Sequence, residues 1–186
     1  MIRRAGFGPA FLLVSIVLGA IVAPAMLGRS LHEILAAAAL CLLAAAIAIE
    51  DLRSMLIPDI PVLAIGLVGL GLAIHDIGEA AGIALWIVGA IGVAGALLAF
   101  SIVYGHLRGR FVLGFGDVKL VAASGLLIGP WGVGMQIFIA SISAMIFVII
   151  RAIRRGRKPR WSARVPFGTF LAPAAVVVWA WFGRGM

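Results

Sequence analysis

Long apolar runs separated by short polar segments dominate this sequence and restrict what it can fold into. Of its 186 residues, 64% are hydrophobic and 12% are charged, whereas soluble domains average about 45–50% and about 25%. A helix that crosses a bilayer needs about 20 apolar residues, so the chain has room for about six or seven spans. We therefore predict an all-α transmembrane helix bundle that forms one integral membrane domain, residues 1–186.

The apolar runs define the predicted spans and the turns between them. They cover residues 8–27, 31–49, 60–74, 81–104, 117–128, 132–150 and 165–182. The basic start and Ala23-Pro24-Ala25 imitate a signal peptide, but the number of later runs favours a retained first helix. The run 117–128 is short for a span unless it begins inside the membrane edge or packs away from lipid. Gly129-Pro130-Trp131 predicts a tight turn after it.

The basic residues are placed as in a membrane protein rather than in a nucleic-acid-binding protein. The net charge is +8, but seven of the fifteen Lys and Arg residues lie in one loop, residues 151–164, between two apolar runs. Such a loop is typical of the cytoplasmic side and of contact with anionic lipid headgroups. If the N-terminus lies inside and seven spans follow, thirteen of the fifteen basic residues are cytoplasmic, and Asp51 and Asp117 share that side.

The sequence offers no ligand pattern for a metal or a cofactor, and we expect neither. Its one cysteine, Cys41, lies inside an apolar run, which excludes an internal disulfide and a zinc site built from several cysteines. The histidines do not have the spacing of metal ligands; they are His32, His75 and His106.

Carboxylates at the edges of apolar runs are the candidate functional groups. A charge in a membrane segment is costly and marks a functional site by default, and Asp117 begins such a run directly after Gly114-Phe115-Gly116. Any acidic partner on the same side must come from the 50–59 segment. That segment holds Glu50, Asp51 and Asp59. Asp51 is the first choice, but spacing alone does not decide among the three.

Two neighbouring carboxyl groups would form an acid–base site. At a separation of about 3 Å they share one proton, so one can act as general base on a water while the other acts as general acid toward a scissile carbonyl. Glycine allows another chain to approach closely. Gly114 and Gly116 therefore suit a site that binds an extended substrate.

Non-catalytic interpretations fit the same residues. Asp117 can cap the helix that follows it, and Asp51 can pair with Arg53 or Lys119. Lys119 is also a typical snorkelling residue at the membrane interface. The competing class of protein is a small proton- or ion-coupled transporter, or an assembly subunit without protease activity, since intramembrane acids suit ion movement as well.

Three segments together resemble those of the prepilin peptidases, the type IV leader peptidase family of membrane aspartyl proteases. They are Asp51-Leu52-Arg53-Ser54-Met55-Leu56-Ile57-Pro58-Asp59, Gly114-Phe115-Gly116-Asp117-Val118-Lys119-Leu120 and Val165-Pro166-Phe167-Gly168-Thr169-Phe170-Leu171-Ala172. The second is similar to the Gly-x-Gly-Asp signature, which proteases of the presenilin and signal-peptide-peptidase type share. The first and third segments favour prepilin peptidases.

The resemblance implies an activity and the residues that carry it. It implies that Asp51 and Asp117 form a catalytic dyad, which activates water and cleaves the short basic leader from type IV prepilins or pseudopilins. It implies a bacterial inner (cytoplasmic) membrane, with the site facing the cytoplasm. The residues that would bind substrate or shape the site are Pro58, Asp59, Gly114, Gly116, Lys119, Pro166, Phe167 and Gly168.

The chain differs from the larger members of that family. Those carry an N-terminal region with paired Cys-x-x-Cys motifs and also methylate the new N-terminus, whereas this chain has one cysteine and a short N-terminal region. We therefore expect a peptidase without N-methyltransferase activity, similar to the short type that serves tight-adherence (Flp) pili. The sequence predicts no particular oligomeric state.

Overall fold

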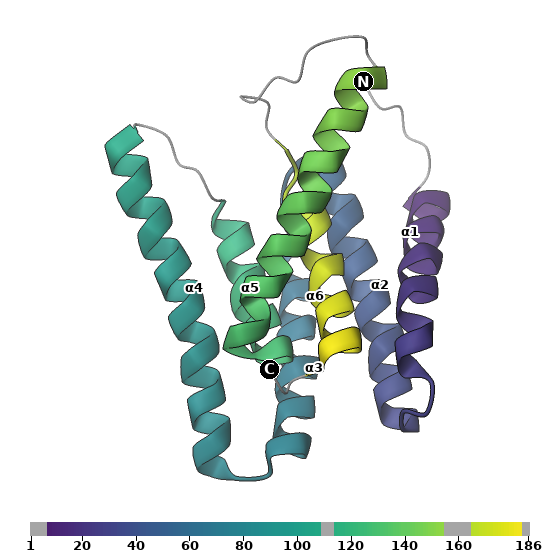
Figure 1. Ribbon diagram of the computed structural model, residues 1–186, viewed down its shortest axis with the longest axis vertical. Coiled ribbons are helices and arrows are strands. Elements are labelled where there is room, and N and C mark those ends of the chain that lie inside the picture. Colours follow the sequence, from purple (N-terminus) through teal and green to yellow (C-terminus); the bar gives the residue numbers. More distant parts are fainter. Residues whose placement is uncertain (1–6, 109–113, 155–164, 184–186) are drawn as a thin grey trace.

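The helices pack side by side as a bundle, and the longest of them folds back on itself (Figure 1). The computed structural model describes residues 7–108, 114–154 and 165–183. Within them the elements are α1 (Phe7–Val22), η1 (Ala23–Met26), α2 (Leu31–Ser54), α3 (Asp59–Ile77), α4 (Ala80–Arg108), α5 (Phe115–Arg154) and α6 (Gly168–Phe182). These described residues contain no strand, so the predicted all-α class is confirmed.

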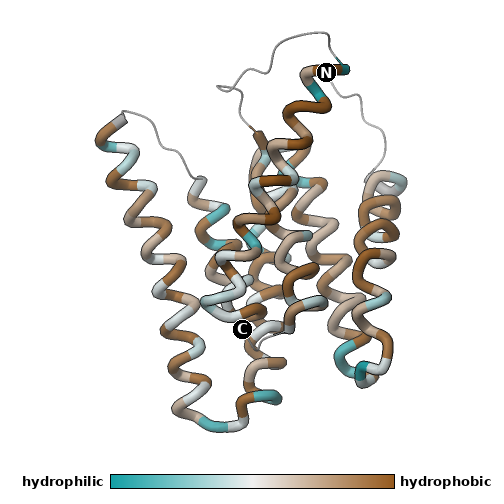
Figure 2. The backbone as a smooth tube through the Cα atoms, viewed as in Figure 1, coloured by the Kyte–Doolittle hydropathy of each residue, from teal (hydrophilic) through white to brown (hydrophobic). Residues whose placement is uncertain are grey.

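Most of these helices are long and apolar enough to cross a membrane. Five of the described helices meet that requirement by length and composition, and α6 is a shorter apolar helix. Hydrophobic segments, brown in Figure 2, run along every helix. Large apolar side chains point outward, such as Leu85 on α4 at 72% exposed and Ile153 on α5 at 74%. The chain is therefore a multi-pass helical membrane protein, as predicted.

A break in α5 produces a helical hairpin within the bundle. Gly129 has a φ of 77° and a ψ of 167°, which is not helical. Ser124 Oγ donates a hydrogen bond of 2.8 Å to Gln136 Oε1, 12 residues away, although 12 residues of unbroken helix span about 18 Å. The arms 115–128 and 130–154 therefore lie side by side (Figure 1). The predicted turn at Gly129-Pro130-Trp131 is confirmed.

The proline at this turn leaves a backbone acceptor that a side chain of α4 satisfies. In an α-helix the carbonyl of one residue accepts from the N–H four residues later. Because Pro130 has no N–H, the Leu126 carbonyl loses its helical donor. Trp86 Nε1 donates to that carbonyl at 3.0 Å, which ties α4 to the turn in α5.

Buried polar side chains connect both arms of α5 to α6. Ser124 and Gln136 are fully buried, and Gln136 Nε2 donates to the Leu171 carbonyl at 3.0 Å. An unpaired polar group in an apolar interior costs about 2–7 kcal/mol, so these bonds favour one arrangement of the three segments. The first arm is itself internal, since Leu120 and Leu127 are completely buried. Of the two explanations for the short run 117–128, this burial supports packing away from lipid.

The helix ends differ from the predicted spans where polar residues continue a helix. Helix α2 extends past residue 49 to Ser54, so Asp51 lies inside the helix rather than after it. Helix α6 begins at Gly168 rather than at residue 165. Most of the basic residues used to predict the orientation lie outside the described residues; they are Arg3, Arg4, Arg110 and those in 155–164. The cytoplasmic orientation therefore stays a prediction.

Gly69 of α3 packs against the backbone of α5, and a side chain there should separate the two helices. A Cβ at Gly69 would lie 2.6 Å from the Leu127 nitrogen, whereas a Cβ at Gly71 would meet nothing within 4 Å. We expect Gly69→Ala to lower the free energy of unfolding by about 1–3 kcal/mol. Gly71→Ala, the matched control, should leave it unchanged or raise it by about 1 kcal/mol. Thermal unfolding in detergent measures both, and equal melting temperatures would contradict this close packing.

Candidate active site

Asp51 is a buried carboxylate that lies against the first turn of α6. It is 4% exposed and belongs to the last turn of α2. The Thr169 N–H donates to Asp51 Oδ2 at 2.8 Å, and the Thr169 hydroxyl oxygen lies 3.2 Å from the same atom. The first N–H groups of a helix have no helical acceptor, and the helix dipole favours a negative charge there. Asp51 therefore caps α6 from a different helix.

Glycine at position 168 allows this close approach. A Cβ at Gly168 would lie 3.1 Å from Asp51 Oδ2 and 2.7 Å from Ile57 Cδ1. Just before it, Pro166 is buried, and Phe167 is the residue that precedes α6. The segment with these three predicted site-shaping residues therefore lies beside Asp51.

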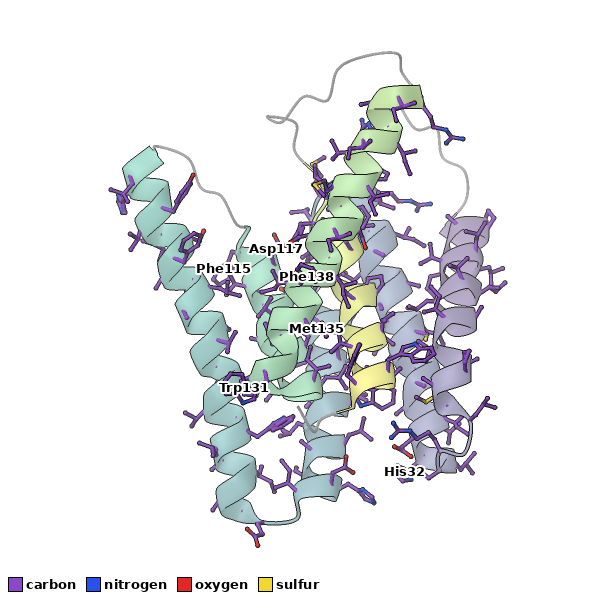
Figure 3. All side chains as sticks on the ribbon, in the orientation of Figure 1. His32, Phe115, Asp117, Trp131, Met135 and Phe138 are labelled. Carbon is purple, nitrogen blue, oxygen red and sulfur yellow. The ribbon has the colours of Figure 1, made fainter. Side chains whose placement is uncertain are left out.

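Asp117 lies in the first turn of α5. Figure 3 shows Asp117 and Phe115 at the start of the first arm and Trp131 at its other end. The Asp117 N–H donates to the Gly114 carbonyl at 3.0 Å, and a Cβ at Gly114 would lie 3.2 Å from Asp117 Oδ2. Asp117 is half-buried, and the negative charge of Asp51 acts on it. The two predicted acids are therefore close enough for the charge of Asp51 to affect Asp117.

Ile57 contacts the segments that carry both acids. It lies between α2 and α3, and its Cβ would be 3.1 Å from a Cβ at Gly116, while its Cδ1 would be 2.7 Å from one at Gly168. Gly116 is inside helix α5 and has a helical backbone. Its contribution is the absence of a side chain, which leaves room for Ile57. Before this turn, Met55 has a left-handed φ of 56°, which costs a residue other than glycine about 1–2 kcal/mol. This strained residue ends α2 two positions before Ile57.

Lys119 and Asp59 form an ion pair between α5 and α3. Lys119 Nζ lies 2.9 Å from Asp59 Oδ1, and the two side chains are 42% and 75% exposed. The ammonium group also lies 5.1 Å from the centre of the Phe115 ring. Exposed ion pairs contribute about 0.2–1 kcal/mol, so this pair orients the first turn of α5 more than it stabilises the fold. Among the described contacts, Lys119 pairs with Asp59, which follows Pro58, rather than with Asp51.

The three acids of the 50–59 segment have different surroundings. Asp59 is largely exposed and is engaged by Lys119, and Glu50 is half-buried. Asp51 alone among the three is buried, and its charge acts on Asp117. These surroundings favour Asp51 over its rivals as the partner of Asp117.

Two residues of this site have no separate signal in the sequence. Thr169 and Ile57 stand inside the segments that resemble the family, but a threonine at a helix start and an isoleucine in a turn are common features. Thr169 becomes recognisable only because α2 and α6 meet, at residues 118 positions apart.

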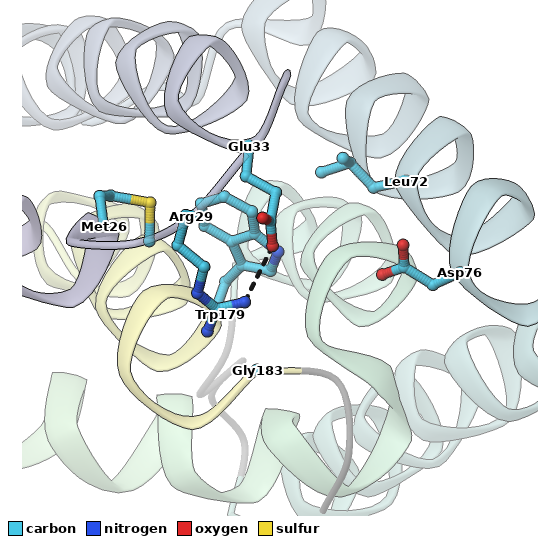
Figure 4. A pocket seen from close by; sticks show the side chains of 7 residues that line it. All are labelled: Met26, Arg29, Glu33, Leu72, Asp76, Trp179 and Gly183. Atoms are coloured by element: carbon cyan, nitrogen blue, oxygen red, sulfur yellow. Dashed lines mark hydrogen bonds and ion pairs between the residues drawn. The ribbon is translucent and has the colours of Figure 1, made fainter. Parts of the chain in front are cut away.

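A pocket, shown from close by in Figure 4, is present as well, and its lining residues place it at the opposite end of the bundle from these acids. It is lined by Met26, Arg29, Glu33, Leu72, Asp76, Trp179 and Gly183. These residues come from η1 and the segment that leads into α2, from the start of α2, and from the ends of α3 and α6. Asp51, Asp59 and Thr169 mark the other ends of α2, α3 and α6. Arg29 and Glu33 are paired at 2.8 Å, so each charge in this pair is already matched. Among the described residues, no three His, Cys, Asp or Glu side chains form a group that could hold a metal ion.

The fold and the two acids define a polytopic membrane protein with a candidate acid–base site at one end. Residues 38–149, which include Asp51 and Asp117, match the model of the type IV leader peptidase family. A prepilin leader peptidase/N-methyltransferase of Burkholderia pseudomallei is 33% identical over 173 residues, which are 91% of this chain and 54% of that protein. A protein of the same name from Aeromonas salmonicida is 31% identical over 149 residues, 79% of this chain and 49% of that protein.

This chain therefore belongs to the type IV leader peptidase family. A further relative of the same name, from Xanthomonas campestris, is 33% identical over 134 residues, 70% of this chain and 44% of that protein. The chain thus spans about half the length of the curated relatives it matches. No solved structure matches it.

The space at Gly168 is limited by Ile57 and Asp51, so an added methyl group should displace one of them. We expect Gly168→Ala to lower the free energy of unfolding by about 1–3 kcal/mol. Because Ile57 Cδ1 would be the nearest atom, at 2.7 Å, Ile57→Val should recover part of the loss, with a coupling energy of about 0.5–3 kcal/mol. Denaturant unfolding of the four proteins in this double-mutant cycle measures the coupling.

The control for this cycle is Gly95→Ala on α4, where an added Cβ meets nothing within 4 Å. It should not lower stability. Strict additivity of Gly168→Ala and Ile57→Val would show that the two positions do not compete for the same space.

Proposed function

We propose that this chain is a membrane aspartic endopeptidase that removes the short basic leader from type IV prepilin-like proteins. The observation that supports it most is a buried Asp51 whose charge acts on Asp117, the acid of the Gly-x-Gly-Asp segment. Membership of the type IV leader peptidase family supports the reaction class. The substrate class follows from the relatives, which are named prepilin leader peptidases.

The dyad would work by general acid–base catalysis on a water molecule. One carboxylate takes a proton from the water as it attacks the scissile carbonyl, and the protonated partner gives its proton to the carbonyl oxygen. When the tetrahedral intermediate collapses, the leaving amine takes the proton from the first acid, and a hydroxyl of the intermediate returns one to the second. The dyad is then restored with a single shared proton. Its apparent titration belongs to the pair rather than to Asp51 or Asp117.

The position of the acids suits a substrate that is cut at the membrane boundary. Asp51 lies in the last turn of α2 and Asp117 in the first turn of α5. A peptide bond just before an apolar transmembrane helix would reach this depth, whereas a bond in the middle of the bilayer would not. Glu50 adds negative charge near the site, which would favour a basic leader over an acidic one.

The proposed location is the inner membrane of a bacterium, with the site on the cytoplasmic face. Thirteen of the fifteen basic residues would lie on that side, as the positive-inside rule requires. Anionic lipid headgroups would contact those basic residues. The partners of the protein would thus be prepilins or pseudopilins and membrane lipid.

The proposed activity does not include methylation of the product. The relatives are named N-methyltransferases as well, but this chain has one cysteine and so cannot form paired Cys-x-x-Cys motifs. We expect a prepilin processed by this protein alone, in cells without another leader peptidase, to keep an unmethylated N-terminus. Mass spectrometry of the processed prepilin measures this, and a methylated terminus would contradict it.

Removing either acid should abolish cleavage. We expect Asp51→Asn and Asp117→Asn each to lower the cleavage rate of a co-expressed type IV prepilin from the same genome by about 100- to 10,000-fold, because each removes one half of the acid–base pair. Immunoblots that separate the prepilin from the shorter product measure the rate.

Asp76→Asn is the matched control, since Asp76 lies in the pocket at the opposite end of the bundle. It should cleave like the wild-type protein. Normal cleavage by either Asp51→Asn or Asp117→Asn would refute the dyad. A folded wild-type protein that leaves prepilin intact but moves protons in vesicles would favour the transporter class instead.

A further inference from the structure

The Thr169 hydroxyl has two acceptors within reach and one proton to donate. Its oxygen lies 3.2 Å from Asp51 Oδ2 and 3.1 Å from the Ala48 carbonyl oxygen. The Thr169 N–H separately donates to Asp51 Oδ2 at 2.8 Å. A hydroxyl donates one hydrogen bond and can accept two. At the junction of α2 and α6, the Thr169 hydroxyl can therefore donate its proton to the carboxyl oxygen or to the backbone carbonyl, but not to both at once.

This geometry satisfies Asp51 in either protonation state. When Asp51 is ionised, the Thr169 hydroxyl donates to Oδ2 together with the backbone N–H. When Oδ2 carries a proton, Asp51 donates it to Thr169 Oγ1, and the hydroxyl turns its own proton to the Ala48 carbonyl. Rotation about the C–O bond of Thr169 makes the change. No heavy atom has to move, which is the property expected of a preorganised site.

We propose that Thr169 is a positioning residue that acts through Asp51, its hydroxyl alternating between Asp51 and Ala48 as the carboxyl group loses and gains its proton. The inference rests on the proposed function, in which Asp51 takes up and releases one proton in every catalytic cycle. One acceptor would be enough to satisfy the single donor of a threonine hydroxyl. Here both acceptors lie within hydrogen-bonding distance of one hydroxyl.

The charged groups around this junction come from the neighbouring helices. The charge of Asp51 acts on Asp117 of α5, and Asp59 on α3 is paired with Lys119 on α5. Helix α2 itself adds Glu50 and Arg53. Helix α6 has no charged residue. Among the described contacts of the Asp51 side chain, the hydrogen bonds come from Thr169 of α6.

Two substitutions at position 169 separate the hydroxyl from the shape of the side chain. Thr169→Val keeps the shape and the backbone N–H but removes the hydroxyl, whereas Thr169→Ser keeps the hydroxyl on a smaller side chain. The purified proteins are assayed in detergent against a type IV prepilin from the same genome, with kcat, KM and the pH profile of kcat as readouts. Asp51→Asn is the inactive reference.

We expect Thr169→Val to lower kcat about tenfold or more, with little change in KM. The acidic side of its pH profile should move to higher pH, because the bond from the hydroxyl to the ionised carboxylate is charge-assisted and is the stronger of the two bonds lost. Thr169→Ser should keep both kcat and the pH profile close to those of the wild-type protein. Thr169→Ala, a second variant without the hydroxyl, should behave like Thr169→Val.

Infrared spectroscopy tests the same exchange without a substrate. The carbonyl stretch of protonated Asp51, assigned by its loss in Asp51→Asn, should shift in frequency in Thr169→Val and stay in place in Thr169→Ser. If the wild-type protein does not cleave prepilin, the proposed function is wrong. The infrared result still tests whether the Thr169 hydroxyl is hydrogen-bonded to protonated Asp51.

Two outcomes would overturn the role of Thr169. One is a Thr169→Val protein with the kcat, pH profile and infrared band of the wild-type protein. The other is an equal loss of kcat in Thr169→Val and Thr169→Ser, which would assign the effect to packing rather than to the hydroxyl. Melting temperatures of all variants show whether they fold, and Thr169→Ala replaces Thr169→Val if the valine variant is unstable.

Discussion

A buried carboxylate at the junction of two helices is the constraint on which the rest of this structure depends. Asp51 is 4% exposed, and a buried charge is stable only when it is paired or hydrogen-bonded. Its donors come from Thr169 in the first turn of α6, where backbone N–H groups have no helical acceptor. Gly168 must lack a side chain for α6 to come this close. The hydrogen bonds between Asp51 and Thr169 therefore determine where the start of α6 lies against α2.

The hairpin in α5 holds the same helix from a second side. Gln136 donates to the Leu171 carbonyl of α6 and is itself bonded to Ser124 on the first arm. Helix α6 is thus bound near its start by Asp51 and by Gln136 on the second arm of α5, which Ser124 links to the first arm. Since lipid surrounds the bundle, helix association depends on close packing and interhelical hydrogen bonds rather than on a difference in polarity between helix surface and solvent. These few buried hydrogen bonds consequently determine much of how the helices are arranged relative to one another.

Local chemistry predicts the turns of this chain better than it predicts which residues meet. The reversal at Gly129-Pro130 is readable because glycine accepts a φ of 77° and proline lacks an N–H. Asp51, in contrast, competes with Glu50 and Asp59 in the sequence, and burial within the folded bundle separates the three. Thr169 has no local signal at all, since its bond to Asp51 joins residues 118 positions apart. The elements and the candidate acids follow from sequence, whereas the contacts of each acid follow from long-range packing.

The N-termini of two helices lie at the proposed dyad, where they can stabilise its negative charge. A pair of carboxyl groups that share one proton keeps one negative charge, and at the edge of a membrane such a charge is costly. The first turn of α6 lies against Asp51, and Asp117 belongs to the first turn of α5. Each helix start carries roughly half a positive charge. Lys119, the cation beside Asp117 in sequence, is paired with Asp59. The helix dipoles can therefore stabilise the shared charge without adding a titratable group that would compete for the proton.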